Sequence, residues 1–112
     1  MKIYKEIVKI NKELGGKLVR PSSLDFACDE VSWETNVYKK VAYIIRAIVV
    51  DHPFSDMNKS TAIIFTIRIF EREKINGSEA CLKRMIKNVA VKNVNSIEKI
   101  EKMLRRCYPK KK

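Results

Sequence analysis

The chain has few of the residues that are needed for folds rich in turns or for folds stabilised by a bound metal ion. Its 112 residues include three glycines, three prolines and one histidine. An all-β sandwich needs many turn residues, so this composition argues against one. The three cysteines, Cys28, Cys81 and Cys107, are widely spaced and form no Cys-x-x-Cys pair. That spacing excludes the usual zinc sites and gives no disulfide framework, so we expect reduced, mostly buried thiols.

The chain also lacks a long hydrophobic run. The longest, "VAYIIRAIVV", is interrupted by Arg46 and is too short to cross a bilayer. The opening "MKIYKEIVKI" alternates charged and apolar residues and has no signal-peptide core. Hydrophobic residues make up 46% and charged residues 33%, which is typical of a globular protein. We therefore expect one cytoplasmic domain over residues 1–112, with no membrane partner.

The charge is strongly unbalanced, with 24 Lys and Arg against 13 Asp and Glu. A net charge of +11 attracts phosphates of any kind, but lysines that simply solvate the outer helix faces are the favoured explanation. A basic nucleic-acid-binding helical domain is one alternative, supported mainly by the C-terminal "RRCYPKKK". The aromatic residues are scattered and form no stacking platform, which disfavours nucleic acid as a partner. Residues 108–112 are expected to form a basic, frayed tail.

The apolar periodicity predicts an all-α fold, a compact bundle of about six helices. A helix over 3–14 ends at Gly15-Gly16, and the Pro21-Ser22-Ser23 stretch starts a short second helix by capping. Residues 29–36 hold the only Trp and show no periodicity, which predicts a short flap. The helices expected over 35–50 and 58–74 are apolar on most faces and are therefore central. Two further helices begin at caps, Ser78 and Ser96.

The stretch "DHPFSDMNKSTA", residues 51–62, lies between the two central helices. Pro53 prevents smooth continuation of the first, so the chain turns and a new helix begins near Asn58. A helix N-terminus offers free backbone N–H groups that bind anions, and Lys59 adds a positive charge there. Asp56 is a candidate ligand for a divalent metal ion, and His52 is a candidate general base.

Each of these residues also has an ordinary structural role. A His before Pro commonly ends a helix, Asp56 is a candidate cap, and Phe54 is expected to plug the core. A base, a metal ligand and a phosphate-binding turn close together in sequence are nevertheless what phosphoryl transfer requires. The combination favours a functional site.

The segment "HPFSDMNKSTA" resembles the signature of the Fic/Doc family, roughly His-Pro-Phe-x-[Asp/Glu]-[Gly/Ala]-Asn-[Gly/Lys]-Arg-Thr-Ala. The surrounding segments, "ELGGKLVRPSSLDFAC", "KKVAYIIRAIVVDHPF" and "FTIRIFEREKING", are similar to the short Doc (death-on-curing) branch. The resemblance is tight over residues 37–77 and loose over 5–107.

The resemblance implies a transferase that moves a phosphate or a nucleotidyl group (AMP in most Fic members) from a nucleoside triphosphate, with Mg²⁺, onto a protein hydroxyl. His52 would be the general base and Asp56 the Mg²⁺ ligand. The positions expected around the nucleotide, ATP by the same resemblance, are Phe54, Asn58, Lys59 and Ser60. Target proteins would dock at the flap. The intramolecular inhibitory segment of some Fic members is missing, so a toxin of this kind would need a small antitoxin in trans.

Two positions depart from the family pattern. Met57 stands where the family has Gly or Ala, and its bulk crowds a site where backbone approaches phosphate. Ser60 stands where the family has Arg, and a short neutral side chain cannot clamp a phosphate. These departures predict a weakened transferase. The alternative is a catalytically inactive member that binds nucleotide or a partner protein.

Overall fold

The computed structural model describes residues 2–109 and is all-α over that range, as the periodicity predicts. Six α-helices and one π-helical turn occur among the described residues, and the only β-pairing in this range is an isolated bridge between Leu18 and Phe54. The helices are α1 (Lys2–Glu13), α2 (Ser22–Val31), α3 (Val37–Ile45), η1 (Arg46–Val50), α4 (Asn58–Arg72), α5 (Glu79–Lys92) and α6 (Ile97–Cys107).

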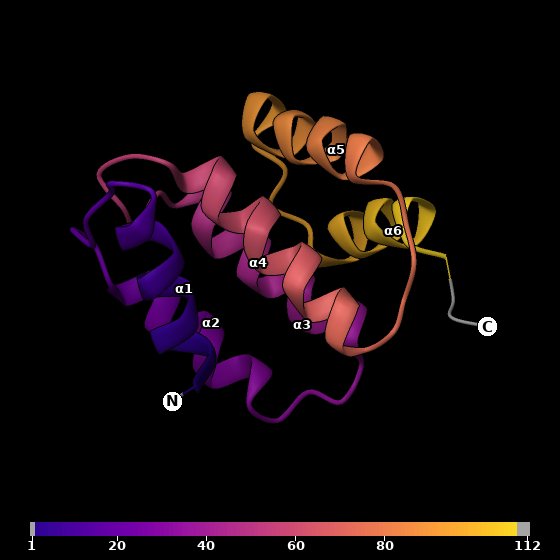
Figure 1. Cartoon of the computed structure of the whole chain (residues 1–112), viewed down its shortest axis with the longest axis horizontal. Coiled ribbons are helices and arrows are strands. Elements are labelled where there is room, and N and C mark those ends of the chain that lie inside the picture. Colours follow the sequence, from indigo (N-terminus) through magenta and orange to yellow (C-terminus); the bar gives the residue numbers. More distant parts are fainter. Residues whose placement is uncertain (1, 110–112) are drawn as a thin grey trace.

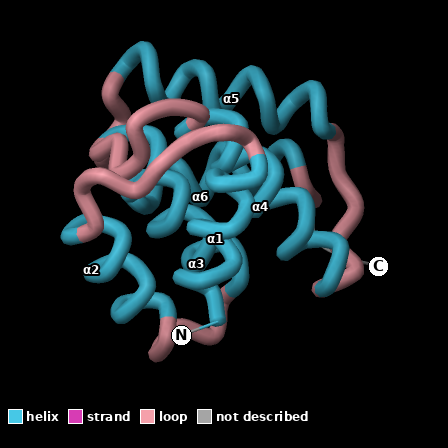
Figure 2. The backbone as a smooth tube through the Cα atoms, turned by 60° about the vertical axis from the view of Figure 1, so that its left-hand side comes forward, coloured by secondary structure: helices cyan, strands magenta, loops and turns pink. Residues whose placement is uncertain are grey.

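The central helices are those on either side of the 51–57 turn. α4 runs back beside α3 and η1 (Figure 1), and α3 with η1 also contacts α2, α5 and α6. α1 packs on α4 and α2, while α5 and α6 cover the opposite side. The 14–21 and 51–57 loops meet at one end of the bundle (Figure 2), where the Leu18–Phe54 bridge joins them. This meeting of two loops determines the site described below.

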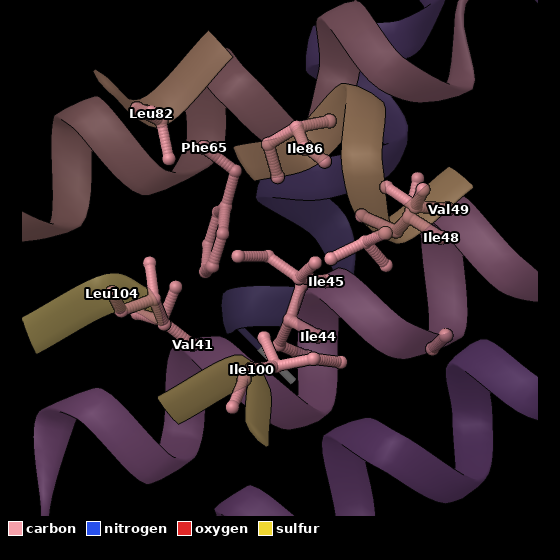
Figure 3. Close-up of a cluster of buried hydrophobic side chains, with 14 of the residues drawn as sticks. Val41, Ile44, Ile45, Ile48, Val49, Phe65, Leu82, Ile86, Ile100 and Leu104 are labelled. Carbon is pink, nitrogen blue, oxygen red and sulfur yellow. The ribbon is translucent and has the colours of Figure 1, made fainter. Parts of the chain in front are cut away.

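The core is mainly aliphatic, and its largest part lies between α3, η1, α4, α5 and α6. Figure 3 shows Phe65 of α4 with Leu82 and Ile86 of α5 above it and Ile45 of α3 beside it. All four are at most 2% exposed. Burying a side chain of this kind stabilises the fold by roughly 1.5–3 kcal/mol. The all-round apolar character of the two central helices therefore reflects burial on several sides.

Most helix ends follow their local sequence. Gly15 has φ +96, which ends α1 in the left-handed region, and the side chains of Ser78 and Ser96 accept backbone N–H bonds at the starts of α5 and α6. The cap predicted for α2 is wrong in its chemistry. Pro21 is the N-cap and no side chain caps the helix, because Ser22 is already helical.

The helix expected over 35–50 begins at Val37, capped by the Asn36 side chain, but it is not α-helical throughout. After Ile45 it widens into the π-helical turn η1. The wider turn lets consecutive residues, Ala47, Ile48 and Val49, all face the core. Single π-helical turns occur often at functional sites. Here Asp51 alone separates the turn from the only histidine.

The flap expected over 29–36 is shorter than predicted. α2 continues to Val31, so only residues 32–36 lie outside a helix. Helical spacing continues through the buried Leu24, Cys28 and Val31, and this packing overrides the weak periodicity of residues 29–31. Trp33 in the remaining loop is 89% exposed.

Two further expectations are wrong. Cys81 and Cys107 form a disulfide, with an S–S distance of 2.07 Å, and only Cys28 is a free, buried thiol. The pairing was not visible in the sequence because 26 residues separate the two cysteines and only the packing of α5 on α6 joins them. The predicted frayed tail also begins too early. Tyr108 is 4% exposed and its ring stacks on Phe70. Its carbonyl accepts a hydrogen bond from the Tyr38 hydroxyl. Residues 110–112 lie outside the described range.

No helix in the described part of the chain combines the length and apolar character needed to cross a membrane. This agrees with the short, Arg-interrupted hydrophobic run of the sequence.

Candidate functional site

His52 sits in a strained turn directly after η1. Its φ is +50, in the left-handed region that non-glycine residues rarely adopt, and its side chain is exposed. The His52 N–H donates to the Ile48 carbonyl at 3.2 Å, an α-type bond over four residues that closes the end of η1. The His52 carbonyl accepts a 2.7 Å hydrogen bond from the Arg20 guanidinium. Both backbone groups of His52 are therefore hydrogen-bonded, the N–H to η1 and the carbonyl to Arg20.

The loop between α1 and α2 supplies most of this support. Residues 17–20, here called the strap, lie antiparallel to residues 53–55. The Pro53 carbonyl accepts from the N–H groups of Val19 at 2.8 Å and Arg20 at 2.9 Å. The Ser55 N–H donates to the Lys17 carbonyl at 2.8 Å. Together with the Arg20 side chain, four hydrogen bonds fix the turn against a segment far away in sequence.

Asn58 closes the turn from the other end. Its side-chain oxygen accepts from the Phe54 N–H at 3.2 Å, and its side-chain nitrogen donates to the Phe54 carbonyl at 3.0 Å. Phe54 is 2% exposed and plugs the core, as the sequence predicts. The Asn58 amide therefore shapes the loop, and what Asn58 presents to a ligand is its backbone N–H.

Met57 precedes α4 with φ +63, also left-handed. This conformation explains why a small residue suits the position: a glycine adopts it without strain. The Met57 side chain is 40% exposed, so it borders the pocket instead of filling the core. The Met57 N–H donates to Asp56 Oδ1 at 2.8 Å, which orients that exposed carboxylate beside the start of α4.

The first turn of α4 carries unpaired donors. The N–H groups of Asn58, Lys59 and Ser60 make no hydrogen bond within residues 2–109, and the first paired amide is that of Thr61, which donates to the Met57 carbonyl at 2.9 Å. A pocket of about 340 Å³ opens over these groups. Its lining residues are His52, Ser55, Asp56, Met57, Asn58, Lys59 and Ser60. Free N–H groups and the positive end of the helix dipole favour an anion there.

Asn11 links α1 to the floor of the turn. It is 1% exposed, and its Nδ2 donates to the Asp56 carbonyl at 2.9 Å and to Thr61 Oγ1 at 3.1 Å. Thr61 in turn donates to the Met57 carbonyl at 2.6 Å. This buried chain of polar groups fixes the backbone on either side of Met57.

Five of the six candidate residues named from the sequence line the pocket, and Phe54 lies beneath it in the core. Sequence reasoning missed Arg20, Asn11 and the strap. Asn11 carried one signal: it follows Ile7 by four residues, on the apolar stripe of α1, where a polar side chain is unexpected. Nothing in the sequence indicated Arg20, because its contact depends on how two loops meet.

The comparison with known families agrees with this geometry. The model of the Fic/DOC family matches residues 2–70, which includes α1, the strap, the His52 turn and most of α4. Residues 71–107 lie beyond the match. No curated protein sequence matches the chain. The family match covers more than half of the 112 residues. The chain belongs to the Fic/DOC family.

Proposed function

We propose that the chain transfers a phosphate or a nucleotidyl group from a nucleoside triphosphate, ATP in the first instance, to a protein hydroxyl. The observation that carries this proposal is the single pocket over the start of α4. It holds an imidazole, a carboxylate, a lysine and three free backbone N–H groups. Phosphoryl transfer depends mainly on positioning and charge neutralisation, and these groups supply both.

The residues fit a phosphate group. The free N–H groups of Asn58, Lys59 and Ser60 all belong to one helical turn, so they converge on one anion. The Lys59 side chain adds a point charge, and the Ser60 hydroxyl adds one more donor. The exposed position of the pocket leaves the rest of a nucleotide free to lie outside it.

The residues also fit Mg²⁺, in the way that this ion is usually bound with nucleotides. Among the described residues, Asp56 is the only carboxylate that lines the pocket, and one of its oxygens remains free of the Met57 N–H. Mg²⁺ commonly takes one or two carboxylates, with phosphates and water filling the other positions. Bound there, it would neutralise charge on the phosphates. Asp56 would hold it close to the start of α4.

His52 would act on the acceptor. A neutral imidazole accepts the proton of the target hydroxyl as its oxygen bonds to phosphorus. The bond between phosphorus and the leaving group then breaks. ADP leaves if the γ-phosphorus is attacked, and pyrophosphate leaves if the α-phosphorus is attacked. The strap and η1 hold the His52 backbone, so the point from which the imidazole projects into the pocket is fixed.

One observation favours the second candidate, a member that binds nucleotide or a partner without turnover. Lys59 is the only cation that lines the pocket, and Ser60 occupies the position of the family arginine. Loss of a phosphate-clamping arginine costs on the order of 10³–10⁵ in rate in other phosphoryl-transfer sites. We therefore propose that transfer is slow and that it takes place in the cytoplasm. If the protein acts as a toxin, a small antitoxin would restrain it.

The test is transfer of label to a cell lysate from ATP labelled on either the α- or the γ-phosphate, with Mg²⁺ present. The matched variant is His52→Asn, because Asn tolerates the left-handed conformation and lacks a basic nitrogen. We expect weak label with the wild type and none with His52→Asn, while circular dichroism stays unchanged. Equal labelling by both proteins would refute the role of His52.

A separate titration tests binding apart from turnover. Addition of ATP and Mg²⁺ should shift the backbone amide signals of Asn58, Lys59 and Ser60, and Lys59→Gln should weaken the affinity. Lys87→Gln, an exposed lysine on α5, is the charge control and should leave the affinity unchanged. Binding without transfer would support the inactive member, and no shift at millimolar nucleotide would exclude both.

A further inference from the structure

The Cys81–Cys107 disulfide lies at the opposite end of the molecule from the His52 turn. It joins the start of α5 to the end of α6, at the right of Figure 1, whereas the 51–57 turn lies at the left. The two ends share no lining residue. The disulfide is therefore a feature that the transferase proposal does not use.

The two sulfur-bearing residues differ in access. Cys107 is 3% exposed, whereas Cys81 is half-buried and sits in the first turn of α5. Thiol–disulfide exchange needs direct approach of a thiolate to one sulfur. The more exposed residue, Cys81, is therefore the expected point of attack, with Cys107 as the leaving sulfur.

The surroundings of the disulfide are positively charged. A shallow pocket of about 180 Å³ borders both cysteines and is lined by Arg84 and Arg106. No acidic residue lines it, and neither guanidinium forms an ion pair with another residue in 2–109. A local positive field raises the concentration of an anionic reactant, and guanidinium groups bind carboxylates well.

We propose that this disulfide is an exchange site for a low-molecular-mass anionic thiol of the glutathione type. The thiolate bonds to Cys81 Sγ, the Cys81–Cys107 bond breaks, and the electron pair stays on Cys107, which takes a proton from solvent. The product is a mixed disulfide at Cys81 and a free thiol at Cys107. Attack by Cys107 on the mixed disulfide reverses the reaction. No outside oxidant is needed, because the disulfide itself is reduced.

The experiment measures the rate of mixed-disulfide formation by intact mass, with peptide mapping of the modified cysteine. Glutathione is the anionic probe and cysteamine the cationic one, and the ratio of their rate constants removes effects of access. We expect peptide mapping to find glutathione on Cys81. The ratio of the glutathione to the cysteamine rate constant should fall roughly tenfold in the Arg84→Gln/Arg106→Gln variant, because two nearby positive charges are lost. Added salt should lower the wild-type ratio in the same direction.

The matched control is Lys87→Gln/Lys99→Gln, which removes two exposed charges from the same two helices outside the pocket. Its ratio should equal that of the wild type. An unchanged ratio in the arginine variant, or glutathione attached to Cys107 alone, would overturn the proposal. Cys107→Ser provides a second measurement, because its free Cys81 should react with oxidised glutathione faster than the buried Cys28 does.

Discussion

The Arg20 guanidinium donates a 2.7 Å hydrogen bond to the His52 carbonyl, 32 residues further along the chain. The same residue donates its backbone N–H to the Pro53 carbonyl at 2.9 Å. His52 is held in a left-handed conformation that costs a non-glycine residue on the order of 1–2 kcal/mol. Arg20 therefore stabilises a strained turn at the residue proposed to act as base.

Arg20→Ala should loosen that turn. The bond is exposed, so we expect a loss of only about 1 kcal/mol in the free energy of unfolding, measured with urea. The rate of transfer should fall by more than this loss of stability explains, because the backbone that carries the imidazole is no longer fixed. Arg68→Ala removes an exposed arginine from α4 and is the charge control. If Arg68→Ala lowers transfer as much as Arg20→Ala, the effect is one of net charge.

Met57→Gly should relieve the left-handed conformation before α4. The gain in unfolding free energy should be small, about 0.5 kcal/mol, because glycine also gains freedom in the unfolded chain. Pyrophosphate, a probe of the anion site, should bind more tightly as the methionine side chain is removed. Isothermal titration calorimetry measures this affinity.

Lys74→Gly is the matched control for that change. Lys74 has φ +57 and is exposed beyond the end of α4, far from the pocket lining. It should give a similar stability gain with no change in pyrophosphate affinity. A tighter affinity in both variants would assign the effect to a general gain in stability and not to space at the anion site.

Ser60→Arg should restore the cation that the family pattern has at this position. Ser60 belongs to the first turn of α4 and lines the pocket. We expect transfer to rise by roughly 10²-fold or more, in proportion to what such arginines supply elsewhere. Val91→Arg adds the same charge at an exposed site on α5, outside both the pocket and the flap, and should have no effect. Labelling that is equal in wild type and Ser60→Arg would show that Ser60 is no lesion.

The buried thiol of Cys28 should make stability depend on alkaline pH. Burial, followed by the nearby carboxylates of Asp25 and Asp29, raises the pKa of Cys28 from 9.0 to about 11. The unfolded thiol loses its proton first, so from about pH 9 to pH 11 the unfolded chain holds fewer protons and stability falls as pH rises.

Urea unfolding at pH 8 and pH 10.5 checks this dependence. The wild-type midpoint should be lower at pH 10.5, and Cys28→Ala should show a smaller drop between the two values. Burial also raises the pKa values of Tyr4 and Tyr108. The Tyr108 contribution is the same in both proteins, whereas Cys28 adds to the raised pKa of Tyr4, so Cys28→Ala removes that small part as well. The same drop in both would mean that Cys28 does not cause it.

The sequence by itself determined the helices and the core-facing residues. Apolar spacing, Gly15 and the Ser78 and Ser96 caps act within one or two turns, so they are readable without a partner segment. The 51–57 turn and the start of α4 are predictable for the same reason. Pro53 ends one helix, and the candidate site residues all lie within the nine consecutive residues 52–60.

Only the tertiary structure decided which residues hold that turn and which cysteines form the disulfide at the opposite end of the molecule. Arg20 meets His52, Asn11 meets Thr61 and Cys81 meets Cys107 across separations of 32, 50 and 26 residues. No local pattern encodes such contacts. Two helices with the same periodicity can pack in several registers, and polar side chains find partners only after the packing has brought their segments together.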